Sequence, residues 1–166
     1  ETLKIVKEEF ELAEVMEFCY SVTKTLISVM PGNKSKIKAV KKFDENINQY
    51  LIDSDKTRLK QVLLNFLSNS VKFTKSGEIT VSALMESSSN NETCICISVE
   101  DTGIGMHKSD LDKILSVNEK VISIDTDYEY NAMGTGLGIN ISKSILNKLD
   151  HKLNISIRLL KLSHNK

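Results

Sequence analysis

Apolar residues recur at helical spacing in three segments of the chain. Residues 11–30 place them three and four positions apart, which predicts a helix ended by the Pro-Gly pair that follows. A longer pattern over residues 56–73 predicts a second helix, because residues 53–55 offer aspartate and serine caps just before it. Residues 136–149 begin within a cluster of glycines and predict a third helix. The apolar positions of the first helix are Leu12, Val15, Met16, Cys19, Val22, Leu26 and Val29.

Shorter apolar runs predict strands between these helices. Residues 37–43 and 46–53 read as two short strands joined by a turn, and residues 78–85 and 93–100 read as a hairpin with a polar loop. Residues 152–160 are expected to form a closing strand. Because helices and strands interleave, we expect a single domain of the α/β class, a two-layer α/β sandwich with a mixed sheet packed against about three helices.

Composition is typical of a soluble globular domain. The chain has 166 residues, of which 40% are hydrophobic and 27% are charged. Its 22 basic and 22 acidic residues cancel, which disfavours nucleic acid as a partner. No apolar run is long enough to span a membrane, and the N-terminal segment lacks the apolar core of a signal peptide. We therefore expect a cytoplasmic domain without direct membrane contact.

The cysteines and histidines show no metal-binding pattern. Cys94 and Cys96 lie two positions apart in a strand-like run, Cys19 lies in the first predicted helix, and the three histidines are not at ligand spacing. The simplest interpretation is that all three cysteines are buried, reduced thiols.

The helix predicted over residues 56–73 has two distinct faces. One face is largely apolar, whereas Asn65, Asn69 and Lys72 fall on a polar stripe one turn apart, together with Gln61. The stripe could be an ordinary solvated face, but asparagine is a poor helix former, which weakens that alternative. Amide oxygens can serve a hard cation or its bound waters, and a lysine can meet a phosphate. The apolar face comprises Leu59, Val62, Leu63, Phe66, Leu67 and Ser70.

Two glycine-rich motifs follow this helix. The run "DTGIGM" places Asp101 at the end of an apolar strand, where a charged side chain is costly unless a partner satisfies it. The run "GTGLGI" opens the third helix, and such a turn can form an anion site or can be turn chemistry alone. It lacks the last glycine of a dinucleotide-binding fingerprint, and the chain has no P-loop. The His-Arg-Asp and Asp-Phe-Gly motifs of serine/threonine protein kinases are also absent.

The order of these features resembles the GHKL superfamily of ATP-binding domains. Within it, the catalytic and ATP-binding domain of two-component histidine kinases is the closest match. "DKTRLKQVLLNFLSNSVKFT" resembles the N box of that family, "DTGIGM" its G1 box and "GTGLGI" its G2 box. The resemblance implies a domain that binds ATP and Mg²⁺ and that works in sensor or hybrid kinases.

The resemblance also implies a role for each residue of the boxes. Asp101 would accept a hydrogen bond from the exocyclic amine of adenine. Asn69 would hold Mg²⁺ with help from Asn65, and Lys72 would contact phosphate. The glycine-rich segments would wrap the purine and offer backbone N–H groups to the phosphates. The remaining residues of the implied ATP site are Phe73, Gly103, Ile104, Gly105, Met106, Gly134, Thr135, Gly136, Leu137 and Gly138.

Asn65 separates the subfamilies. In the gyrase, chaperone and mismatch-repair ATPases, the family has at this position a glutamate that activates water, whereas an amide cannot act as a general base. The resemblance therefore favours a kinase over an ATP-hydrolysing machine. Steady phosphate release by the chain would revive the hydrolytic alternative.

The chain departs from the family pattern in three places. No phosphoacceptor histidine box is present, so we expect a fragment that acts on a separate dimerisation and phosphoacceptor domain, and only indirectly on a response regulator. The long segment between the two glycine motifs, the expected lid, lacks phenylalanine and arginine, which leaves Lys113 or Lys120 to meet the γ-phosphate. His151 falls where the family has a glycine pair and reads as a surface turn residue. The alternative is a degenerate domain that serves as a nucleotide-binding or regulatory module without kinase activity.

Overall fold

The computed structural model describes residues 4–30, 36–87, 93–105 and 137–149. Helices are interspersed among the strands along these residues, and a short 3-10 turn, Ile47–Gln49, precedes the third strand. Among the described helices, none combines the length and the apolar content that crossing a membrane requires. In chain order the elements are β1 (Glu8–Glu11), α1 (Leu12–Val29), β2 (Ile37–Phe43), β3 (Leu51–Ser54), α2 (Lys56–Phe73), β4 (Gly77–Ser87), β5 (Thr93–Asp101) and α4 (Leu137–Lys148).

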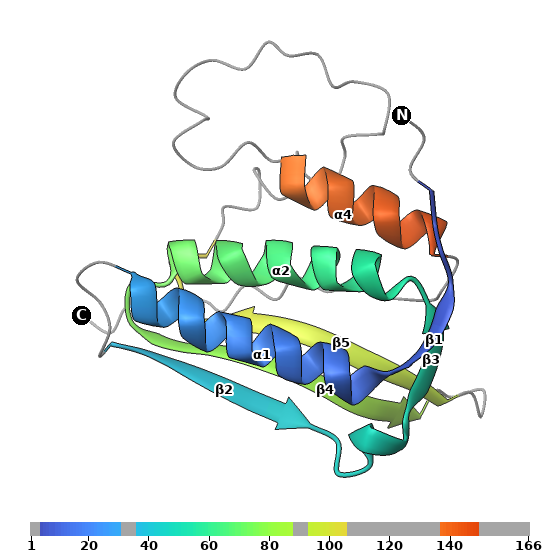
Figure 1. Ribbon diagram of the computed structural model, residues 1–166. Helices are drawn as coiled ribbons and strands as arrows, with labels where there is room; N and C mark the ends of the chain where they lie inside the picture. Colours follow the sequence, from blue (N-terminus) through green and yellow to red (C-terminus); the bar gives the residue numbers. More distant parts are fainter. Residues whose placement is uncertain (1–3, 31–35, 88–92, 106–136, 150–166) are drawn as a thin grey trace.

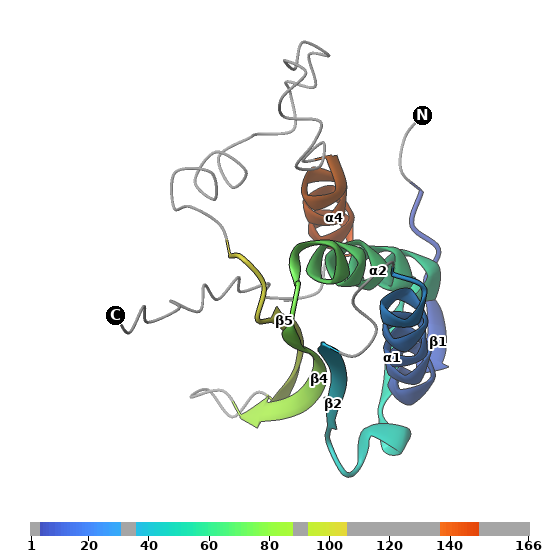
Figure 2. The ribbon, with the colours of Figure 1, turned by 90° about the vertical axis from the view of Figure 1, so that its left-hand side faces the viewer.

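The elements form two layers, as the sequence predicts. The main sheet has the order β2-β4-β5, with β2 parallel and β5 antiparallel to the central strand β4. Helices α1 and α2 pack on one face of this sheet, and α4 packs against α2 (Figure 1). Seen along their axes, the three helices form a column beside the sheet (Figure 2). The expected two-layer arrangement of a mixed sheet and three helices is confirmed.

A second, two-stranded sheet was not predicted. Strand β1 pairs antiparallel with β3. The strand predicted over residues 46–53 is wrong in its first half, because Asp44 caps a turn there: its carboxylate accepts hydrogen bonds from the Asn46 N–H at 2.9 Å and from the Tyr50 hydroxyl at 2.8 Å. The strand therefore begins only at Leu51, and it pairs with β1 rather than with β2.

The main core lies between α1, α2 and the sheet. The apolar side of α1 meets that of α2 and the inward side chains of β4, and members such as Met16, Leu67 and Ile79 are fully buried. Burying a side chain of this size stabilises the fold by roughly 1.5–3 kcal/mol. A smaller cluster joins Val62 of α2 to Ile145 and Leu149, and this cluster holds α4 in place against α2.

Helix α2 begins and ends where the sequence predicts. The buried Asp55 is its N-cap, with one carboxylate oxygen accepting from the Arg58 N–H at 2.9 Å. The other oxygen accepts from the Val6 N–H at 2.9 Å, which ties the N-terminal segment to the start of the helix. An N-cap of this kind contributes about 1 kcal/mol.

The expectation of three buried cysteines is wrong in part. Cys19 is fully buried, and burial raises the pKa of its thiol to about 11. Cys94 is exposed and Cys96 is half-buried, because both lie on the face of β5 opposite the helices. All three thiols are free. Among the described residues, no group of three or more His, Cys, Asp or Glu side chains could hold a metal ion.

Candidate functional site

The polar stripe of α2 faces away from the main core. Gln61 and Lys72 are exposed, whereas Asn65 and Asn69 are half-buried between them. The Lys72 ammonium lies 5.1 Å from the centre of the Phe73 ring. The helix carries four basic residues and no acidic one. Two of them contact α1, since Lys56 pairs with Glu14 and the Lys60 ammonium lies 4.6 Å from the centre of the Phe18 ring. Arg58 and Lys72 lie on the side of the polar stripe.

Asp101 ends β5 beside α2, and its carboxylate is held from two sides. The Ser70 hydroxyl of α2 donates to Oδ2 at 2.8 Å, and the Gly103 N–H donates to Oδ1 at 2.9 Å. These bonds offset the cost of placing a half-buried carboxylate at the edge of the core. A carboxylate accepts about four hydrogen bonds. Asp101 therefore keeps acceptor capacity for a bound group.

The segment after Asp101 folds back onto the end of α2. The Ile104 N–H donates to the Phe73 carbonyl at 3.2 Å, and a Cβ atom at Gly103 would lie 2.6 Å from that carbonyl oxygen. Gly105 has φ of +69°, a conformation that side chains rarely allow. Ile104 itself is 59% exposed. The two glycines therefore let the backbone lie against α2 while the apolar Ile104 side chain stays available to a ligand.

Thr102 fixes the same segment to the start of β4. Its hydroxyl donates to the Ser76 carbonyl at 3.1 Å and accepts from the Glu78 N–H at 2.9 Å. Gly77 has φ of +105°, and a Cβ atom there would overlap the Thr102 hydroxyl oxygen. These contacts join the Asp101 segment to the turn that follows α2, and the sequence alone gave no sign of them.

The N-terminal turn of α4 packs against Asn65. The Asn65 amide donates to the hydroxyl of the buried Ser142 at 3.1 Å. Gly138 lies so close that a Cβ atom would overlap Asn65 Oδ1. Helix α2 thus contacts the Asp101 segment through Ser70 and the start of α4 through Asn65.

Replacing Gly138 with alanine is expected to disturb this junction. In an open helix the change would be stabilising by up to ~1 kcal/mol, but overpacking costs ~1–3 kcal/mol. We expect a lower melting temperature and a loss of about 10-fold or more in nucleotide affinity, because Asn65 or α4 must move. Asn147→Ala, an exposed change on the same helix, is the control. Full stability and full affinity in the Gly138 variant would contradict the assigned contact.

Asn65 and Asn69 provide some of the ligands that a site for a hard cation needs. Asn65 uses its NH₂ group for Ser142, which leaves its oxygen as an acceptor. Within the described part of the chain, the Asn69 side-chain amide has no hydrogen-bond partner. Amide oxygens are suitable ligands for Mg²⁺, which usually keeps several waters and takes further oxygens from substrate phosphates. The pair can supply protein ligands to such an ion but cannot enclose it.

Some predicted site residues lie outside the described residues. Four of the fourteen predicted ATP-site residues are among them: Met106, Gly134, Thr135 and Gly136. The expected lid, the expected closing strand and His151 also lie outside the described residues. Leu137 is the first residue of α4. The structure thus describes the other ten predicted residues, which lie on α2, at the end of β5 and just after it, and at the start of α4.

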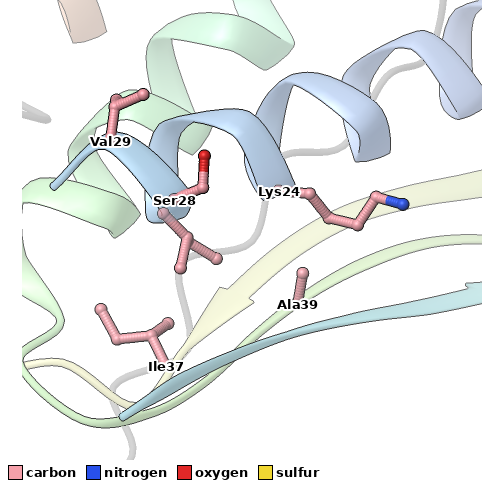
Figure 3. A pocket seen from close by; sticks show the side chains of 6 residues that line it. Lys24, Ser28, Val29, Ile37 and Ala39 are labelled. Atoms are coloured by element: carbon pink, nitrogen blue, oxygen red, sulfur yellow. The ribbon is translucent and has the colours of Figure 1, made fainter. Parts of the chain in front are cut away.

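The surface of the described residues is hollowed in at least two places. One is lined by Ile27 together with Lys24, Ser28, Val29, Ile37 and Ala39, between the end of α1 and the start of β2 (Figure 3). None of the predicted site residues lines it. The other lies between α1, α2 and α4 and includes Asn65, Gly138 and Ser142. Only the second hollow reaches the candidate site.

Sequence reasoning missed two hydroxyl groups of the site. Ser70 was assigned to the apolar face of α2, and its only signal was a polar residue among apolar ones. Thr74, the C-cap of α2, is 1% exposed, and its hydroxyl finds no partner in the described residues. An unpaired buried hydroxyl costs roughly 1–3 kcal/mol.

Comparison with known sequences finds histidine kinases. The chain is 39% identical over 95 residues to hybrid signal transduction histidine kinase B of Dictyostelium discoideum, a match that covers 57% of this chain and 5% of that protein. It is 36% identical over 111 residues to the autoinducer 2 sensor kinase/phosphatase LuxQ of Vibrio vulnificus, which covers 66% of this chain and 13% of that protein. The chain thus spans a small part of the relatives it matches.

Comparisons with solved structures and with family models agree with the comparison of sequences. The structure is similar to the nucleotide-free catalytic domain of histidine kinase ThkA, with a TM-score of 0.62 and 24% identity, over 87% of this chain and 82% of that chain. At this identity the similarity establishes a shared fold. Residues 54–163, more than half of the chain and including all three boxes, match the model for histidine kinase-, DNA gyrase B- and HSP90-like ATPases. The chain belongs to this family of ATP-binding domains.

Proposed function

We propose that the chain is the catalytic domain of a sensor or hybrid histidine kinase, which binds Mg-ATP and donates the γ-phosphoryl group to a histidine on a separate helical domain. One observation carries this proposal. Helix α2 holds a carboxylate at one end through Ser70 and packs its Asn65 against the glycine-led helix α4. In the proposal this carboxylate is the base-binding group and the first turn of α4 is the phosphate-binding turn, and both are held by contacts with one helix.

Each part of the site has a task in this proposal. Asp101 accepts a hydrogen bond from the 6-amino group of adenine, and the exposed Ile104 side chain covers the purine. Lys72 and the N-terminal turn of α4 bind phosphate oxygens through an ammonium and backbone N–H groups. Asn69, assisted by Asn65, holds Mg²⁺, and the ion neutralises charge on the phosphates when bound. Catalysis then rests on positioning and electrostatics.

Asn65 supports transfer to a protein over transfer to water. Its NH₂ group is committed to Ser142, and its amide oxygen is too weakly basic to take a proton from water. The residue therefore orients phosphates or the ion's water shell. The base for the acceptor histidine would come from the other domain.

A transfer assay with separate components tests the proposal. The chain is mixed with Mg²⁺, radiolabelled ATP and the histidine-bearing helical domain of the same kinase. We expect acid-labile phosphate on that domain only when all components are present. Binding without transfer would favour the degenerate regulatory module. Steady release of inorganic phosphate by the chain alone would favour a hydrolase.

A further inference from the structure

Ser70 is a buried serine in the apolar face of α2. It is 6% exposed, and its neighbours along that face, Leu63, Leu67 and Val71, belong to the main core. A serine here lowers the helix propensity and adds a polar group to the core side of α2, each at a cost in stability. Among the described residues, the one side chain that its hydroxyl bonds is that of Asp101, which ends a different element of the fold.

The two bonds to Asp101 hold separate oxygens from separate elements. Ser70 reaches Oδ2 from the helix layer, and the Gly103 N–H reaches Oδ1 from the segment that follows β5. A carboxylate bonded through one oxygen can still turn about its terminal torsion, whereas two donors on opposite oxygens fix its plane. Because both groups donate, the carboxylate can only accept from a third group.

We propose that Ser70 is a positioning residue for base recognition, which holds the Asp101 carboxylate in the plane that accepts the 6-amino group of a purine. The inference rests on the proposed function, and it adds that selectivity between purines depends on a residue that does not touch the base. A 6-amino group donates to the fixed carboxylate. A 6-oxo group would place oxygen against oxygen, and a purine with no group at this carbon would leave the carboxylate unused.

The variant Ser70→Ala separates a positioning role from a structural one. Alanine is the better helix former, so the helix is expected to fold. We expect affinity for a non-hydrolysable ATP analogue to fall by roughly 3- to 10-fold, less than the full value of one hydrogen bond to a charged group, because Ser70 acts on the base only through the carboxylate. Affinity for the matching purine riboside nucleotide, which lacks the 6-amino group, should stay the same. The affinity for the ATP analogue divided by the affinity for the purine riboside nucleotide therefore falls. A general loosening of the site would instead lower the two affinities by the same factor.

Ser82→Ala is the matched control. Ser82 is also a buried serine, and it loses one hydrogen bond, to the Ser98 hydroxyl at 2.6 Å, on the sheet face opposite the helices. Both affinities should be unchanged in this variant. The double variant Ser70→Ala with Asp101→Asn should bind no more weakly than Asp101→Asn alone, because Ser70 acts through the carboxylate.

The experiment is a calorimetric titration of the wild type and these variants with the two nucleotides. A lower affinity ratio in Ser70→Ala, absent in the Asp101→Asn background, would support the inference. An unchanged ratio, or an equal loss for both nucleotides, would overturn it while the wild type still binds ATP. Failure of the folded wild type to bind either nucleotide would instead overturn the proposed function on which the inference rests.

Discussion

Asp101→Asn is expected to lower the affinity of the chain for adenine nucleotides by about 100-fold. The asparagine has one acceptor oxygen where the carboxylate has two, yet both the Ser70 hydroxyl and the Gly103 N–H donate here. One of these donors, or the 6-amino group of adenine, must then face the NH₂ group. The Ser70 hydroxyl can turn to accept from that NH₂ group, but the Gly103 N–H and the 6-amino group are then left with one neutral oxygen. A lost hydrogen bond to a charged acceptor is worth roughly 1.5–3 kcal/mol, the scale of a 100-fold change. The measurement is a calorimetric titration with a non-hydrolysable ATP analogue.

Glu100→Gln is the control for this change. It removes one carboxylate charge at the adjacent residue of β5, whose exposed side chain points to the opposite face of the sheet. Its affinity should remain that of the wild type. Equal weakening in the two variants would show that only the net charge matters, and an unchanged affinity in Asp101→Asn would refute the assigned role of Asp101.

Asn69→Ala is expected to abolish magnesium-dependent phosphoryl transfer, with a loss of about 100-fold or more in rate. The change removes an amide that has no partner among the described residues, so the fold should lose little stability. Nucleotide binding measured without Mg²⁺ should persist, because the purine contacts lie on Asp101. The transfer rate to the histidine-bearing domain and the binding affinity are measured side by side.

Gln61→Ala serves as the comparison for Asn69. Gln61 is an exposed amide on the same stripe, two turns before Asn69, and its oxygen accepts from the Arg58 guanidinium at 2.7 Å. Transfer should continue at close to the wild-type rate in this variant. Wild-type transfer by Asn69→Ala would exclude a role for Asn69 in holding the ion.

Sequence reasoning reached the parts of the fold that depend on local signals. The bounds of α2 were predicted without error, because a capping aspartate precedes a regular apolar pattern. Strand β1 was missed since its short charged sequence gives no strand signal, and it forms only by pairing with β3. The turn before β3 depends on bonds between Asp44 and Tyr50, six residues apart, which an apolar pattern does not show.

Some residues of the candidate site could likewise be predicted from the sequence, and others could not. Asp101 and the asparagine stripe stand out in the sequence because they are polar where a core or a good helix former is expected. Ser70, the hydrogen-bond partner of Asp101, does not stand out in the sequence. It lies 31 positions away, and the packing of α2 on β5 decides where its side chain points. The contact between Gly138 and Asn65 likewise exists only once α4 lies on α2. Such roles depend on tertiary contacts between residues far apart in the chain.

The most direct test of the central claim is a calorimetric titration of the chain with a non-hydrolysable ATP analogue, with and without Mg²⁺. We expect saturable binding that Mg²⁺ strengthens and that Asp101→Asn weakens by about 100-fold. A folded chain that shows no binding under either condition would contradict the claim and would leave a regulatory module that does not use nucleotide.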